Sequence, residues 1–174
     1  MEHRVRGVTL FLVLVLVAPF PSLAQQAAWH AVVADASERG ERMAVTGRVI
    51  DKATGKALSG VEVYVYQTDA KGIYGDSPRT PRLKATMYTR NDGTYEFVSI
   101  RPGSYPNEKI LAHVHYVVYA DGYKEWQGEL VFEDDPLLTP ERRKEVEKDP
   151  SMLLRPITRD RGIWHVSADV ALLR

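Results

Sequence analysis

The chain has 174 residues, with 23 basic and 23 acidic side chains and no cysteine. This length suits one domain of ordinary size. Balanced charge does not provide the concentrated basic surface that nucleic-acid binding needs, so we expect no nucleic-acid partner. Because no thiolate is available, any metal site must use nitrogen and oxygen ligands, which favours a harder ion.

The first 24 residues have the order of a secretory signal peptide. Arg4 and Arg6 precede an almost unbroken apolar run over residues 7–20, and small residues then lead up to Gln25. This order predicts cleavage before Gln25 and export to the periplasm or out of the cell. The alternative is a retained membrane anchor. The run is shorter than the roughly 20 residues that cross a bilayer, so we expect no stable membrane anchor after cleavage.

Short runs of β type separated by turn residues follow a polar segment over residues 25–42, which we interpret as an N-terminal arm. Residues 61–67 alternate between valine and larger polar or aromatic side chains, and Asn91-Asp92-Gly93 is a strong hairpin signal. The expected strands cover residues 44–50, 61–67, 86–89, 95–98, 113–120, 129–132 and 163–173. This pattern predicts an all-β fold, an antiparallel β-sandwich over residues 43–174.

One short surface helix is expected after residue 139. Thr139 suits the N-cap and Pro140 the first helical position. The charged residues that follow predict a solvated outer face, to which we assign no function.

His113 and His115 are the first candidates for chemistry. Side chains two positions apart on a strand point to the same face, so these imidazoles are expected to project together and could hold one metal ion. Taken alone, the pair is a weak signal that more often reflects two ordinary histidines, partly exposed or satisfied in the core.

Two tyrosines strengthen the metal hypothesis. Tyr105 lies in a constrained turn between Gly103-Ser104 and Pro106, and Tyr74 ends a polar loop that leaves a strand. Either could be an ordinary half-buried tyrosine. Two phenolates together with two neutral imidazoles would form a site that favours Fe(III), because phenolate oxygen is a hard anionic donor.

The order of several segments resembles the intradiol ring-cleavage dioxygenases, the family of catechol and protocatechuate 3,4-dioxygenases. The resemblance runs from about residue 45 to residue 136. Its segments are Gly47-Arg-Val-Ile-Asp51, Gly60-Val-Glu-Val-Tyr-Val-Tyr-Gln67, Gly72-Ile-Tyr74, Thr89-Arg-Asn-Asp-Gly-Thr-Tyr-Glu-Phe97, Ile100-Arg-Pro-Gly-Ser-Tyr-Pro106, Ala112-His-Val-His115 and Leu130-Val-Phe-Glu-Asp-Asp-Pro136.

The resemblance implies a non-haem Fe(III) enzyme that uses O2 to cleave the ring of a catechol or polyphenol between its two hydroxylated carbons. Tyr74, Tyr105, His113 and His115 match the four metal ligands of the family. Tyr105 matches the tyrosinate that leaves iron when substrate arrives and can accept a substrate proton. Related enzymes are commonly oligomeric, which implies a homo-oligomer.

Two substrate-pocket positions depart from the family pattern. Ile110 stands where the family usually has an arginine, and Glu129 replaces a usual glutamine. Losing a cation and gaining an anion should weaken the stabilisation of negative charge on a substrate. Two alternatives therefore stay open: a ferric homologue with altered or little activity, and a metal-free transthyretin-like β-sandwich binding module.

Overall fold

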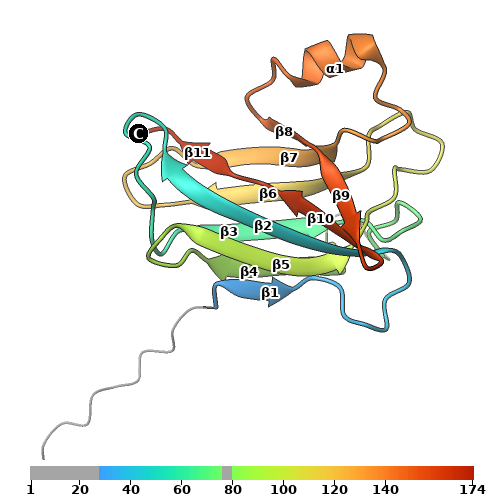
Figure 1. Ribbon diagram of the computed structural model, residues 1–174, viewed down its shortest axis with the longest axis horizontal. Coiled ribbons are helices and arrows are strands. Elements are labelled where there is room, and N and C mark those ends of the chain that lie inside the picture. Colours follow the sequence, from blue (N-terminus) through green and yellow to red (C-terminus); the bar gives the residue numbers. More distant parts are fainter. Residues whose placement is uncertain (1–27, 76–79) are drawn as a thin grey trace, which may run out of the picture.

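The computed structural model describes residues 28–75 and 80–174, and these form two β-sheets that face each other (Figure 1). One sheet has the order β1-β5-β2-β10-β9, with β11 also paired to β2, and the other has the order β4-β3-β6-β7-β8. The strands are β1 His30–Val32, β2 Arg42–Asp51, β3 Glu62–Gln67, β4 Leu83–Tyr88, β5 Thr94–Ile100, β6 His113–Tyr119, β7 Trp126–Phe132, β8 Met152–Arg155, β9 Ile157–Asp160, β10 Ile163–Ser167 and β11 Val170–Leu172.

The core lies between the sheets because side chains along most strands alternate between buried positions and more exposed ones. In β3, Val63 and Val65 are fully buried, whereas Tyr64 and Tyr66 point away from the core and are half-buried. Strand β6 follows the same rule, with Val114, Tyr116 and Val118 buried between the sheets. The opposite face of β6 is therefore free to carry polar side chains.

Strand β6 is the central strand of its sheet. It pairs antiparallel with β3 on one side and with β7 on the other. The register sets Tyr66 of β3 and Glu129 of β7 directly opposite His115 of β6. Three strands thus bring a row of side chains to one outer face.

The predicted β-sandwich with one short helix is confirmed. Five strand pairings are antiparallel, but among the described residues β1–β5, β2–β10, β2–β11 and β7–β8 are parallel. The sequence pattern that predicted an antiparallel sandwich did not indicate these four parallel pairings. These parallel pairings are long-range. Strands β1, β10 and β11 pair with strands from distant parts of the chain, and β8 follows β7 only after the helix. Hairpin signals in the sequence predict only pairings between strands joined by a short turn.

Part of the segment predicted as an arm belongs to the sandwich. Strand β1 pairs with β5, and Val33 and Ala34 just after it are buried in the core. The signal-peptide prediction falls on residues 1–24, which lie outside the described residues.

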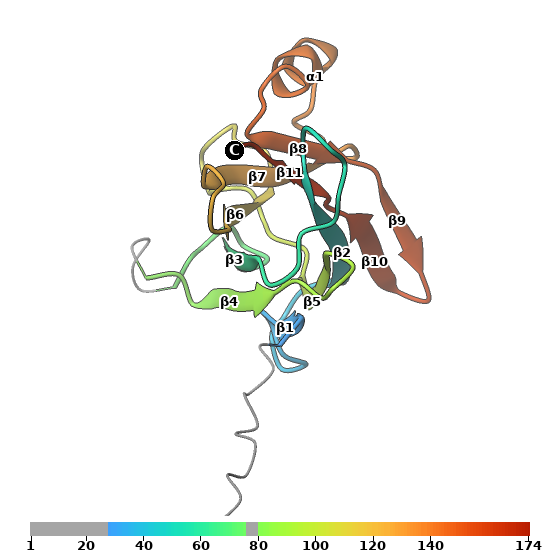
Figure 2. The same cartoon turned by 90° about the vertical axis from the view of Figure 1, so that its left-hand side faces the viewer.

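The helix α1, Pro140–Val146, begins where the sequence predicts. The Thr139 side chain accepts a hydrogen bond from the Arg142 backbone N–H at 3.3 Å. Val146 packs with Leu111 and Val131, so the helix covers the sheet near the start of β6. In Figures 1 and 2 it stands at one end of the molecule, beyond β8. Among the described residues, no helix is long and apolar enough to span a membrane.

Candidate metal centre

The two histidines lie on the outer face at the beginning of β6. His113 is buried and the side chain of His115 is 20% exposed. The pleat of the strand turns both imidazoles to the same side, while Val114 between them enters the core. The expectation that His113 and His115 project together is confirmed.

Tyr74 is carried by a compact loop that leaves β3. The Asp69 carboxylate accepts hydrogen bonds from the backbone N–H groups of Lys71 at 2.8 Å and Ile73 at 3.0 Å. The Asp69 backbone N–H in turn donates to the Ile73 carbonyl at 2.9 Å. These bonds close the loop on itself and direct the next residue, Tyr74, back toward β6.

The Tyr74 loop is attached to the loop that carries Tyr105. The Gly103 backbone N–H donates to the Asp69 carbonyl at 2.9 Å, and the Thr68 hydroxyl donates to the Gly103 carbonyl at 2.9 Å. Gly72, with φ +80°, lies so close to Ser104 that a Cβ would sit 1.9 Å from its carbonyl oxygen. The two loops therefore form one unit in front of the histidines.

The four predicted ligand residues meet at one point. Tyr74 Oη lies 2.5 Å from Tyr105 Oη and 2.8 Å from His115 Nε2. Tyr105 Oη lies 3.2 Å from His113 Nε2 and 3.4 Å from His115 Nε2, and the two Nε2 atoms are 3.0 Å apart. Donor atoms held about 2 Å from one ion are themselves about 2.8 to 3.3 Å apart, so four side chains converge at nearly the spacing that a metal requires.

The hydrogen-bonding roles of these atoms suit a cation. His113 Nδ1 lies 2.7 Å from the Leu111 carbonyl, which can only accept, so Nδ1 carries the proton and Nε2 presents a lone pair. A Glu129 carboxylate oxygen lies 3.5 Å from His115 Nδ1 and favours the same tautomer there. Two lone pairs then face each other, and the two phenol protons cannot satisfy all five close contacts. A cation would satisfy them together.

Burial determines the charge of these groups. Burial raises the pKa of Tyr74, and its hydrogen bond with Tyr105 adds to the rise; burial also raises the pKa of Tyr105. Burial and the neighbouring His113 lower the pKa of His115 to about 4. The imidazole is therefore neutral at neutral pH, as a metal ligand must be. Both phenols stay protonated unless a cation replaces their protons.

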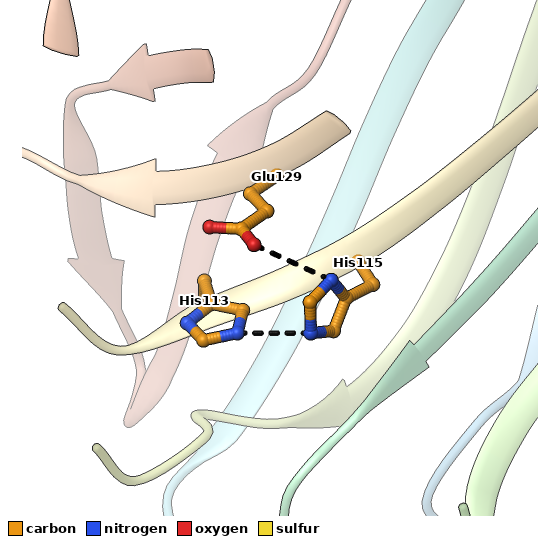
Figure 3. A group of neighbouring side chains, drawn as sticks. All are labelled: His113, His115 and Glu129. Atoms are coloured by element: carbon orange, nitrogen blue, oxygen red, sulfur yellow. Dashed lines mark hydrogen bonds and ion pairs between the residues drawn. The ribbon is translucent and has the colours of Figure 1, made fainter. Parts of the chain in front are cut away.

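Glu129 lies behind His115, away from the point where the four donor atoms meet. Figure 3 shows its carboxylate against one nitrogen of His115, while the other nitrogen faces His113. His113, His115 and Glu129 lie close enough to form a metal-binding group. The donor atoms converge on the Nε2 side of His115, whereas the Glu129 carboxylate contacts Nδ1. Glu129 is therefore placed to support His115 and not to bind the metal itself. The sequence indicated that Glu129 lies near the site but could not predict this direction.

Ile110 and Glu129 line one cavity of about 230 Å³, whose other walls include Val131, Met152 and Arg142 of α1. The Arg142 Nη1 donates to the Lys109 carbonyl at 2.6 Å, which holds the guanidinium beside Ile110. Sequence reasoning assigned the charged helix no function and so missed this cation. A signal was present, because Arg142 and Val146 lie four residues apart and so share one face of α1.

Arg101 and a second, larger cleft are not part of this centre. The Arg101 guanidinium is paired with the Asp134 carboxylate through contacts of 2.6 and 2.8 Å. A larger cleft of about 840 Å³ is lined by residues that include Trp29, Tyr88 and Arg90. None of the four converging residues lines either cavity, but the smaller one includes Glu129, the neighbour of His115, and the larger one does not.

With this geometry established, the chain can be compared with known proteins. The family model described as dioxygenase matches residues 18–150. The chain is 34% identical over 113 residues to the protocatechuate 3,4-dioxygenase beta chain of Burkholderia cepacia, covering 57% of this chain and 48% of that one. It is 30% identical over 152 residues to chlorocatechol 1,2-dioxygenase of Rhodococcus opacus, covering 75% and 59%. The chain belongs to the intradiol ring-cleavage dioxygenase family, which confirms the resemblance seen in the sequence.

Solved structures share the fold. The dioxygenase domain of a dioxygenase–carbohydrate-binding protein fusion from Streptomyces sp. SirexAA-E matches with a TM-score of 0.66 and 24% identity, over 80% of this chain and 84% of that one. The 3-chlorocatechol 1,2-dioxygenase of Rhodococcus opacus 1CP matches with a TM-score of 0.67 and 19% identity, over 84% and 65%. The chain spans about half the length of the curated relatives it matches, 48% and 59% of the two named above.

Proposed function

We propose that this chain is an intradiol ring-cleavage dioxygenase that holds Fe(III) and uses O2 to open the ring of a catechol or larger polyphenol between its hydroxylated carbons. The observation that carries the proposal is the convergence of two phenol oxygens and two imidazole nitrogens, with five contacts of 2.5 to 3.4 Å among them. This convergence favours an enzyme over a metal-free binding module, which would need no such meeting of side chains.

The donor set fits a ferric ion. Tyr74 and Tyr105 would bind as phenolates and offset two of its three positive charges, while His113 and His115 would bind as neutral imidazoles. When bound, Fe(III) supplies a Lewis acid that takes both deprotonated oxygens of a catechol and makes the ring reactive toward O2.

Tyr105 is the residue best placed to move a proton. Its oxygen contacts Tyr74 and both imidazoles, and it is carried by a loop rather than by a strand. As a phenolate, it can accept a proton from a catechol hydroxyl at Oη. Tyr74 and His115, 2.8 Å apart, would stay in place.

The cavity that Glu129 lines adjoins the centre through the contact of Glu129 with His115, and it offers room for the aromatic ring of the substrate. Ile110, Val131 and Met152 offer apolar contact, and Arg142 supplies a cation on the side where the resemblance leads us to expect an arginine at position 110. Glu129, Glu145 and Asp149 in the same lining oppose it with negative charge. This mixture of charges supports a working dioxygenase and also supports the alternative, a ferric protein with little activity.

Iron loading tests the proposal. Protein purified without metal should become red to burgundy with one equivalent of Fe(III), because tyrosinate donates charge to ferric iron, and the colour should change when catechol is added. We then expect one O2 consumed for each muconate-type diacid formed. A protein that stays colourless would refute the metal centre. A coloured protein that consumes no O2 with any catechol would support the altered-activity alternative.

We also infer that the chain is exported, which rests on residues 1–24 alone. N-terminal sequencing of protein recovered from the periplasm or the medium should begin at Gln25. Uncleaved protein that accumulates in the cytoplasm with residues 1–24 intact would contradict export.

A further inference from the structure

His115 lies in the middle of a row of three side chains. Tyr66 of β3 and Glu129 of β7 are its direct cross-strand neighbours on the outer face of the sheet. The Tyr66 ring stacks on the imidazole with a centroid separation of 4.4 Å and an interplanar angle of 16°. The Glu129 carboxylate lies 3.5 Å from Nδ1 on the other side. The strands therefore hold both the plane and the far nitrogen of this ring.

His113 is held differently. Its Nδ1 donates to the Leu111 carbonyl at 2.7 Å, within its own chain segment, and its ring is buried. A carbonyl is neutral, whereas a carboxylate carries a full negative charge. The two imidazoles of one centre thus have partners that differ by one charge. A carboxylate behind a ligating histidine makes the imidazole a stronger donor to the metal.

We propose that Glu129 is a positioning residue for His115 that keeps the proton on Nδ1 and adds a third negative charge to the centre. This inference rests on the proposed metal centre. With two phenolates, the carboxylate brings the negative charges to three, which equals the charge of a ferric ion. The row Tyr66–His115–Glu129 therefore favours Fe(III) over Fe(II).

The test compares the reduction potential of iron-loaded full-length protein with that of Glu129→Gln, which keeps the shape and removes the charge. Loss of the charge should lower the preference for Fe(III) over Fe(II) about tenfold, which raises the one-electron potential by about 59 mV. The tyrosinate absorption band should move to longer wavelength, because the iron becomes poorer in electrons.

Two further variants separate this role from a structural one. Glu125→Gln removes the same charge from an exposed position before β7 and should leave the potential and the band unchanged. Glu129→Asp keeps the charge but withdraws it from Nδ1, so it should raise the potential less than Glu129→Gln. It also provides the measurement if Glu129→Gln does not fold.

The outcomes distinguish this inference from the proposed function. If the unaltered protein develops the tyrosinate band but Glu129→Gln and Glu129→Asp leave its position and the potential unchanged, the role of Glu129 is refuted and the metal centre stands. If Glu125→Gln shifts the potential as much as Glu129→Gln, the effect is general charge and the positioning role is again refuted. If the unaltered protein shows no band, the centre itself fails.

Discussion

The centre is assembled from two halves that are built differently. Its histidines stand on a central strand whose other face is locked into the core, whereas its tyrosines stand on two loops that are hydrogen-bonded to each other. The strand half is stabilised by side-chain packing in the core, and the loop half by hydrogen bonds that backbone groups make with each other and with the Thr68 and Asp69 side chains. The histidine half should therefore be rigid before metal binds, and the tyrosine half should be the part that adjusts to metal and substrate.

Removing one ligand from each half should give the largest contrast. We expect His113→Ala to lower iron affinity by more than about 100-fold, because even the partners behind metal ligands are worth about 10 to 100-fold. Tyr105→Phe should retain iron through the three other ligands and keep a weaker band from Tyr74. Titration with Fe(III), followed by absorbance, measures both. His165→Ala, at an exposed position, is the control. Equal loss in both ligand variants would show that the halves are not distinct.

Separating the two loops should be the next largest effect. Gly72→Ala places a Cβ against the Ser104 carbonyl, whereas Gly122→Ala has nearly the same backbone, φ +79°, with nothing within 4 Å. Both should lose about 1 to 2 kcal/mol for the left-handed backbone. Gly72→Ala should lose roughly 1 to 3 kcal/mol more and shift the tyrosinate band, because the loops must part.

Denaturant unfolding and the absorbance of iron-loaded protein check this pair. A Gly72→Ala variant with an unshifted band would show that the contact between the loops does not position Tyr74.

The core face of β6 should affect stability without affecting metal. Val114→Ala removes two methyl groups from a fully buried position, at a cost of about 2 kcal/mol in unfolding free energy. Val117→Ala, on the half-exposed outer face, should cost less than about 1 kcal/mol. Iron affinity should stay within about threefold in both, since neither valine supplies one of the four converging donor atoms. Loss of iron binding in Val114→Ala would mean that core packing sets the ligand geometry more closely than we expect.

The same division explains how much the sequence could predict. Alternation along a strand is local, so it predicted most strands, their buried faces and the pairing of His113 with His115. Tyr74 and Tyr105 are 31 residues apart and meet only because their loops bond to each other. No local pattern carries that contact, and resemblance alone pointed to it.

Other features were missed for the same physical reason. Strand β1 has three residues and pairs with β5 more than 60 residues later, so it leaves no periodic signal. The direction of Glu129 depends on the register between β6 and β7, which the sequence does not state. Arg142 was readable as part of a helical face, but its cavity exists only once α1 has docked on Val131.

The smallest expected effect concerns Ile110, which lies where the Tyr105 loop joins β6. Its side chain is half-buried and shares a cavity with Arg142 and Glu129. We expect Ile110→Arg to raise turnover of catechol about fivefold, because a cation near a partly solvated substrate anion is worth about 1 kcal/mol. Ile110→Gln, of similar length but uncharged, is the control, and initial rates of O2 uptake measure both.

Arg142→Gln decides what a missing gain would mean. If Ile110→Arg does not raise turnover and Arg142→Gln lowers it, then Arg142 of the helix already supplies the cation that is missing at position 110. The charge that stabilises the substrate would then come from a third element, α1, outside both halves of the centre. If neither substitution changes turnover, charge in this cavity does not limit the reaction. The difference between the rigid histidine half and the adjustable tyrosine half would then concern the metal ligands alone.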